Sequence, residues 1–259
     1  NLSTSGADIS GTANLDAVDI DGNLDVNGGT IKLDGNYPTG TGNVALGNTA
    51  LDDGSLSGAY NTAIGNLALT ANTSGAANTA MGADVMASNT TGGSNSAFGR
   101  NALGTNTTGS NNTAVGYNSL VSGTTGGNNT AVGWSSLFNN TTADNNTAVG
   151  YQAGYTNVAA GAQVFVGYKA GYATTNGGGS STFVGYEAGL SNTTGGNNTA
   201  LGRGSFLDNT TGSNNVGLGY DALANNTTAS NNTAVGYQAG YSTTTGSYST
   251  SVGYQAHYS

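Results

Sequence analysis

The chain repeats itself every 17 residues, and this repeat constrains the fold more than any other feature of the sequence. Residues 111–127 read NNTAVGYNSLVSGTTGG, and residues 128–144 follow as NNTAVGWSSLFNNTTAD. A glycine preceded by an apolar residue marks each of thirteen copies, with a spacing of 17 residues that twice becomes 18: Gly47, Gly65, Gly82, Gly99, Gly116, Gly133, Gly150, Gly167, Gly185, Gly202, Gly219, Gly236 and Gly253. A fixed period of this length indicates stacked units that share one continuous core.

Each copy predicts a short strand followed by turns. In Thr113-Ala114-Val115 the residues alternate with period two, and we expect the apolar residue just before each glycine to be buried. A second apolar column, four residues after the glycine, predicts another buried segment, as at Leu103 and Leu120. Four copies have glycine in this column, and there we expect the next residue to supply the missing volume; the pairs are Gly154 and Tyr155, Gly171 and Tyr172, Gly189 and Leu190, and Gly240 and Tyr241.

The remaining positions favour tight turns over helices. A glycine in every copy is explained by a positive φ, or by a neighbouring chain segment too close for a Cβ, so a side chain there should break the coil. The column four residues before the glycine is Asn in ten copies, which predicts an amide ladder along the stack. No helical periodicity is present, so the sequence predicts an all-β, parallel β-roll or β-solenoid with one repeat per turn, about 60 Å long at ~4.8 Å per turn.

Composition favours a core that several chains share. Hydrophobic residues make up 36% of the 259 residues, but alanine supplies many of them, and each coil offers only two sizeable buried positions. Two such positions per coil are few for the core of a single chain, so we expect an intertwined homotrimer. Residues 1–42 differ from the rest and predict a short turn-rich β shaft, whereas residues 43–259 form the repeat region.

Charge and residue usage exclude several classes of function. The net charge is −9 with only four Lys and Arg, which argues against nucleic-acid binding and against docking on anionic membranes. The sequence contains no apolar run of about 18 residues, the length that would predict insertion into a membrane. The chain has no Cys and a single His, His257, which excludes thiolate chemistry, His-based triads and multi-His metal sites. We therefore expect no cofactor and no catalysis.

The units NNTAVGYNSL, NNTAVGYQAG and NTAIGNLAL resemble the head repeats of trimeric autotransporter adhesins and, more closely, repeats in phage tail fibres. The similarity covers residues 43–259, and VDIDGNLDVNGGTIKLDG in the N-terminal segment resembles the turn-rich shaft of such fibres. The 17-residue period is longer than the usual adhesin-head unit, and residues 157–163 replace the usual turn. The resemblance implies a trimeric left-handed β-roll that serves as a structural and adhesive virion appendage, extracellular, with other tail proteins and a host-surface glycan or protein receptor as partners.

Three alternatives remain open at this point. The first is the head of a bacterial trimeric adhesin on the cell surface. The second is an ice-binding β-solenoid that uses flat threonine arrays such as Thr107-Thr108 and Thr124-Thr125. The third is a glycan-cleaving tailspike in which Glu187 and Asp221, two coils and about 10 Å apart, act as an inverting pair. Only fold analogy supports the third alternative, so the sequence favours a protein without enzymatic activity.

One column provides the candidate receptor contacts. The residue immediately after the glycine is aromatic in eight copies: Tyr117, Trp134, Tyr151, Tyr168, Tyr186, Tyr220, Tyr237 and Tyr254. An outward-facing column of this kind can stack on sugar rings and offer phenol hydroxyls to a glycan. The regularity of the column favours the other interpretation, in which the rings pack between chains or over the next coil.

Overall fold

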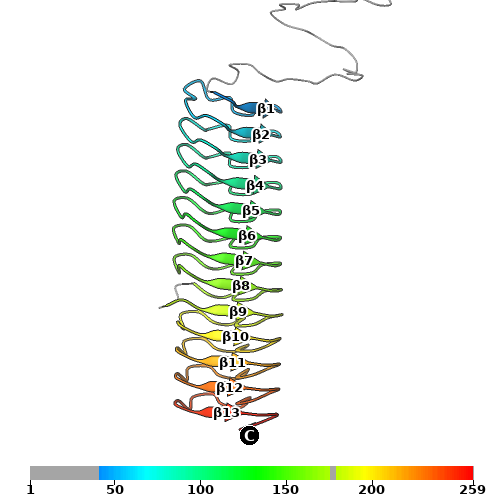
Figure 1. Ribbon diagram of the computed structural model, residues 1–259, viewed down its shortest axis with the longest axis vertical. Helices are drawn as coiled ribbons and strands as arrows, with labels where there is room; N and C mark the ends of the chain where they lie inside the picture. The colour runs from blue at the N-terminus through cyan, green and yellow to red at the C-terminus, as the bar shows by residue number, and fades with distance from the viewer. Residues whose placement is uncertain (1–40, 176–178, 259) are drawn as a thin grey trace, which may run out of the picture. The chain divides into compact units, whose positions relative to one another are not determined.

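The computed structural model describes residues 41–175 and 179–258, which form a β-solenoid of about twelve turns (Figure 1). Each turn contributes one three-residue strand: Val44–Leu46 (β1), Thr62–Ile64 (β2), Thr79–Met81 (β3), Ser96–Phe98 (β4), Thr113–Val115 (β5), Thr130–Val132 (β6), Thr147–Val149 (β7), Val164–Val166 (β8), Thr182–Val184 (β9), Thr199–Leu201 (β10), Val216–Leu218 (β11), Thr233–Val235 (β12) and Thr250–Val252 (β13). The strands pair in parallel, in chain order, as one thirteen-stranded sheet. The predicted all-β solenoid of 17-residue repeats is confirmed. The predicted shaft, residues 1–42, lies almost entirely outside the described residues.

Every strand aligns the same repeat positions with its neighbours. Thr113 pairs with Thr130, Ala114 with Ala131 and Val115 with Val132, and the same register continues along the sheet. The sequence columns are therefore physical columns that run along the solenoid. Away from the sheet, backbone bonds also join successive coils, for example from the Thr107 amide to the Thr124 carbonyl at 2.9 Å.

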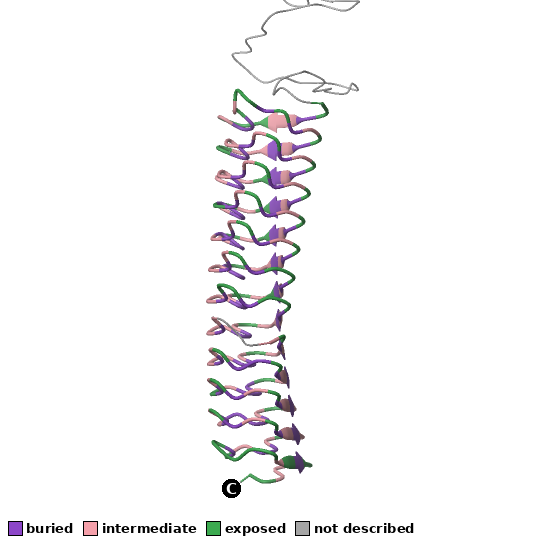
Figure 2. Cartoon of the chain, turned by 90° about the vertical axis from the view of Figure 1, so that its left-hand side faces the viewer, coloured by how far each residue is buried: buried purple, intermediate pink, exposed green. Residues whose placement is uncertain are grey.

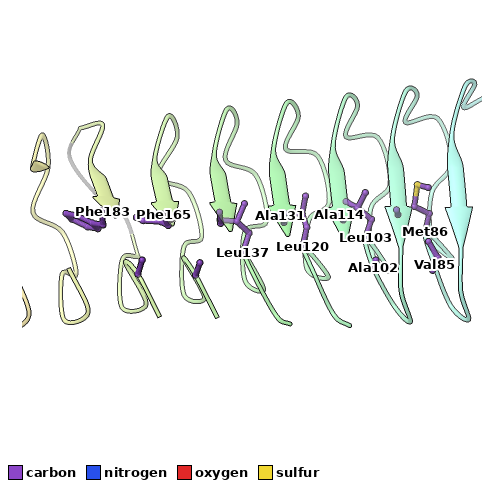
Figure 3. Packing of buried hydrophobic residues seen from close by; sticks show 14 of the residues in the cluster. Val85, Met86, Ala102, Leu103, Ala114, Leu120, Ala131, Leu137, Phe165 and Phe183 are labelled. Atoms are coloured by element: carbon purple, nitrogen blue, oxygen red, sulfur yellow. The ribbon is translucent and has the colours of Figure 1, made fainter. Parts of the chain in front are cut away.

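The face of each strand that points into the core is the opposite of the predicted one. The middle residue of each strand points inward, and Ala63, Ala80, Ala97, Ala114 and Ala131 are fully buried. The apolar residue before the glycine points outward instead; Leu46 is 60% exposed and Val115 37% exposed. Buried residues recur at the strand in successive coils (Figure 2). The coil interior is narrow because the Leu column already fills it from the opposite side, so only a small side chain fits inside the strand (Figure 3).

The second apolar column is buried as predicted, but it is filled differently where glycine replaces leucine. Leu51, Leu69, Leu103 and Leu120 are at most 1% exposed. Beside Gly154, Gly171 and Gly189, the rings of Phe165 and Phe183 fill the core from the strand, where most other coils have alanine (Figure 3).

Large residues at mid-strand thus replace large residues in the turn. A Cβ on Gly154 would lie 2.5 Å from the nearest atom of the Phe165 ring, and a Cβ on Gly189 would lie 2.5 Å from the nearest atom of the Phe183 ring. Tyr155 and Tyr172 are only half-buried and stack with each other. The predicted compensation by the residue after the glycine is therefore wrong.

The repeat glycine lies at a close contact between coils. All thirteen have a φ between +116° and +143°, a region that other residues rarely adopt. A Cβ on Gly133 would also lie 2.7 Å from the carbonyl carbon of Gly150 in the next coil. Both reasons proposed from the sequence, positive φ and close approach, apply at this column.

Two asparagine columns are buried inside the coil. In the column four residues before the glycine, the Asn112 Oδ1 accepts from the Asn129 backbone N–H at 2.9 Å, and the Asn112 Nδ2 donates to the Gly126 carbonyl at 2.9 Å. Side chains in this column therefore form hydrogen bonds mainly with backbone groups rather than with one another. The amide-to-amide ladder lies in a column that the sequence analysis treated as turn, where Asn89 donates to Asn72 at 2.8 Å and Asn106 donates to Asn89 at 2.7 Å.

This ladder is incomplete at its C-terminal end, which provides a stabilising substitution. Asn226 Oδ1 and Thr243 Oγ1 are buried and have no hydrogen-bond partner. Thr243→Asn places an amide where it can donate to Asn226 Oδ1 and to the Gly246 carbonyl, as the preceding rungs do. We expect the free energy of unfolding to rise by about 1 kcal/mol in denaturant titrations. Thr243→Val is the control because it supplies no donor, and equal stability of the two variants would contradict the prediction.

Candidate functional site: the aromatic corner

The eight aromatic residues lie on one corner of the solenoid, at the turn that follows the sheet. Each one comes directly after the repeat glycine, so the strand and the glycine fix its direction. Tyr117, Trp134, Tyr151 and Tyr168 are 39–44% exposed, and Tyr186, Tyr220, Tyr237 and Tyr254 are exposed as well. The structure thus brings all eight predicted residues together on one surface, which we call ladder A.

The rings of ladder A stack on one another along the solenoid axis. Trp134 and Tyr151 have ring centroids 4.9 Å apart and planes inclined by 6°, and Tyr151 and Tyr168 are 5.2 Å apart at 8°. The ring faces are therefore covered by the neighbouring rungs, whereas the ring edges and hydroxyls are free to meet a ligand. Stacking of a sugar on a ring face remains open only at the ends of a stack, so a glycan beside the ladder would contact edges and hydroxyls.

An arginine fills the one coil of ladder A that lacks an aromatic residue. The Arg203 guanidinium carbon lies 5.6 Å from the centroid of Tyr186 and 5.0 Å from that of Tyr220. Arg203 Nη1 also donates to the Tyr220 hydroxyl. The guanidinium is planar and stacks on aromatic faces, so ladder A is continuous from Tyr117 to Tyr254.

A second aromatic ladder runs beside the first, and the sequence analysis missed it. Phe138, Tyr155 and Tyr172 stack with centroid distances of 5.0 and 5.2 Å, and we call this set ladder B. It occupies the position five residues after the repeat glycine, where the sequence analysis expected only a filler for the core. Its signal in the sequence is the pair of aromatics four residues apart in WSSLF, YQAGY and YKAGY.

A polar column separates the two ladders. It contains Ser135, Gln152 and Lys169, all at positive φ. The Lys169 Nζ lies 5.5 Å from the centroid of Tyr168 in ladder A and 5.4 Å from that of Tyr172 in ladder B. One side chain therefore spans the space between the ladders, which places both rings within reach of a single ligand.

Crowding in ladder A raises the pKa of one phenol, that of Tyr237. The pKa of the Tyr237 hydroxyl is raised above its ordinary value, first because neighbouring groups exclude water from it and second because Tyr254 and Tyr220 disfavour its ionised form. A tyrosine hydroxyl with its ordinary pKa of about 10 is already protonated at neutral pH, and the raised pKa extends this protonation to more alkaline pH. The hydroxyl therefore remains a hydrogen-bond donor.

The acids considered for catalysis lie on the same corner. Glu187 and Asp221 occupy the polar column, two coils apart and half-buried. Asp84 is in the same column and pairs with Arg100 at 3.6 Å. Among residues 41–175 and 179–258, no group of three His, Asp or Glu is placed to hold a metal ion.

The threonine arrays considered for ice binding are partly used within the fold. Thr107 Oγ1 donates to the Thr124 carbonyl at 2.9 Å, and Thr124 Oγ1 donates to the Thr141 carbonyl at 3.1 Å. Thr108 and Thr125 in the adjacent column are exposed. Only one of the two predicted columns therefore has hydroxyls free to order external water.

In the described part of the chain, no helix has the length and hydropathy needed to cross a bilayer. No protein-family model matches the chain, and the comparisons with curated proteins and with solved structures give no match.

Proposed function

We propose that the chain is a segment of a homotrimeric extracellular fibre, of the kind found in phage tail fibres, in which three solenoids pack through their sheets and present receptor-binding surfaces along their sides. The observation that carries this proposal is the outward-facing apolar column of the sheet. It consists of Leu46, Ile64, Met81, Phe98, Val115, Val132, Val149, Val166, Val184, Leu201, Leu218, Val235 and Val252, the last residue of each strand. An apolar surface that extends over thirteen consecutive strands is typical of an interface.

The period of this column favours further copies of the same chain as its partner. A partner that packs along the whole sheet must present apolar groups at the same axial spacing, and a second copy does so at every coil. Thirteen strands of three residues, at ~4.8 Å between strands and ~3.3 Å per residue, give a flat face of roughly 600 Å² per chain. That is close to the ~800 Å² that each partner contributes to a stable interface.

The same face argues against ice binding as the main function. Its apolar column mixes Leu, Ile, Met, Phe and Val, and its Thr column is interrupted by Ser96, Val164 and Val216. A packed protein interface tolerates such differences in side-chain volume, whereas matching a crystal lattice requires a regular array. We therefore favour assembly over ice recognition.

The test is the mass of the assembly in solution. We expect light scattering to give three times the chain mass of 25.3 kDa under native conditions and a single chain in denaturant. The double variant Val115→Asp and Val149→Asp should reduce the mass to that of one chain while the circular dichroism spectrum is retained, because both side chains are exposed in the isolated solenoid. Thr108→Asp, in an exposed column outside the sheet, is the matched control and should leave the trimer intact.

A folded wild-type monomer would overturn the proposal. In that case the sheet face is free, and thermal hysteresis of the wild-type protein would test the ice-binding alternative directly.

A further inference from the structure

Ladders A and B meet at the corner that follows β6, β7 and β8. This corner has three features of a ligand-binding surface: exposed aromatic side chains, free ring edges and phenol hydroxyls. Its aromatic side chains are at least partly exposed, although their faces are already covered by stacking. Ring edges carry partial positive charge, and phenol hydroxyls both donate and accept hydrogen bonds. Such a surface suits a ligand rich in oxygen atoms rather than an apolar one.

The charges on the corner favour a neutral ligand. Beside β6, β7 and β8 the corner reads WSSLF, YQAGY and YKAGY, so Lys169 is its one charged side chain. A strongly charged polymer would find an opposite charge at no more than one of these three coils. A neutral hydroxylated polymer needs no charged partner.

The geometry of the ladders favours an extended polymer that lies parallel to the solenoid axis. Successive rungs of ladder A are 4.9–5.2 Å apart from Trp134 to Tyr186, and those of ladder B are 5.0 and 5.2 Å apart. Each coil therefore presents one aromatic ring of each ladder at the same place along the axis. A fully extended β-1,4-linked polysaccharide advances along its axis by nearly this distance per sugar, so each successive sugar meets an equivalent coil.

We infer that the corner formed by Trp134, Tyr151 and Tyr168 on one side and Phe138, Tyr155 and Tyr172 on the other binds a linear, neutral, β-1,4-linked polysaccharide laid along the axis. Gln152, which lies in the polar column between the ladders and is half-buried, faces the sugar hydroxyls. The contact per sugar is weak, and repetition over coils and over chains of the fibre supplies avidity. This inference rests on the adhesive part of the proposed function.

The test uses cellohexaose, a soluble linear β-1,4-linked hexamer, in titration calorimetry with the intact chain. The variant that replaces Tyr151, Tyr155, Tyr168 and Tyr172 by Phe keeps both ring stacks and removes four hydroxyls. We expect this variant to bind the hexamer at least about tenfold more weakly than the wild-type protein, because four hydrogen bonds are lost.

One control makes the result specific. Tyr60→Phe with Tyr248→Phe removes exposed phenols that belong to neither ladder and should leave the affinity unchanged.

Three outcomes would overturn the inference: no binding of cellohexaose by the wild-type protein, equal binding by the four-Phe variant, or tighter binding of an α-1,6-linked glucan hexamer. The mass of the assembly is measured on the same samples. A trimer that does not bind the hexamer refutes this inference alone, whereas a monomer that binds it refutes only the trimer.

Discussion

Replacing Gly133 by alanine is expected to lower the free energy of unfolding by about 4 kcal/mol or more. Gly133 has a φ of +132°, which an alanine adopts only at considerable cost. The added Cβ would also lie 2.7 Å from the carbonyl carbon of Gly150. The next coil cannot move away, because the same column of glycines joins it to the coil beyond. Guanidinium titration followed by circular dichroism measures the loss.

Gly54→Ala is the matched control for this prediction. Gly54 lies outside the glycine column, has no positive φ, and a Cβ added there would meet no atom within 4 Å. We expect its stability to stay within about 0.5 kcal/mol of the wild-type value. Similar losses in the two variants would show that the glycine column does not set the approach of the coils.

Phe165→Ala is expected to cost about 3–5 kcal/mol of folding free energy. The Phe165 ring is fully buried at mid-strand and fills the core beside Gly154 and Gly171, so its removal leaves a cavity that neither glycine can fill. The measurement is again denaturant unfolding.

Gly171→Leu is expected to destabilise the wild-type protein but to stabilise the Phe165→Ala variant. Gly171 has a φ of +61°, close to the +47° of Leu137 at the same repeat position, so a leucine suits this backbone. In the wild-type protein Gly171→Leu should destabilise, because a Cβ there would lie 3.0 Å from the Phe165 Cγ. In the Phe165→Ala background Gly171→Leu should restore stability, because it recreates the pairing of alanine and leucine found in other coils. Additive effects of the two substitutions in the double-mutant cycle would contradict this description of the core.

The two proposed functions, assembly and ligand binding, belong to two adjacent surfaces, the sheet face and the aromatic corner. The sheet face presents the last residue of each strand, and ladder A begins two residues later, beyond the repeat glycine. Substitutions in the two surfaces can therefore test assembly and ligand binding separately.

Local sequence patterns determined much of the architecture. The period gave the number of coils, and the glycine column indicated where coils touch, because a position that excludes every Cβ is visible as an invariant glycine within one chain. Leu103 and Leu120 were placed in the core because a large apolar residue at a fixed repeat position has few other roles in a thin coil. Ladder A was found as a column because its residues are adjacent to the glycine that marks the repeat.

The direction of each side chain was decided by the tertiary structure. A three-residue strand such as Thr113–Val115 alternates equally well in either orientation, and the larger apolar residue was wrongly assigned to the interior. The width of the closed coil settles the choice, since Leu120 from the opposite side leaves room only for Ala114. The exchange of volume between Phe165 and Gly171, and the meeting of ladders A and B, likewise depend on which residues the closed coil brings face to face. The period of the sequence shows which residues recur at the same repeat position. Closure of the coil determines which residues lie opposite one another in the core.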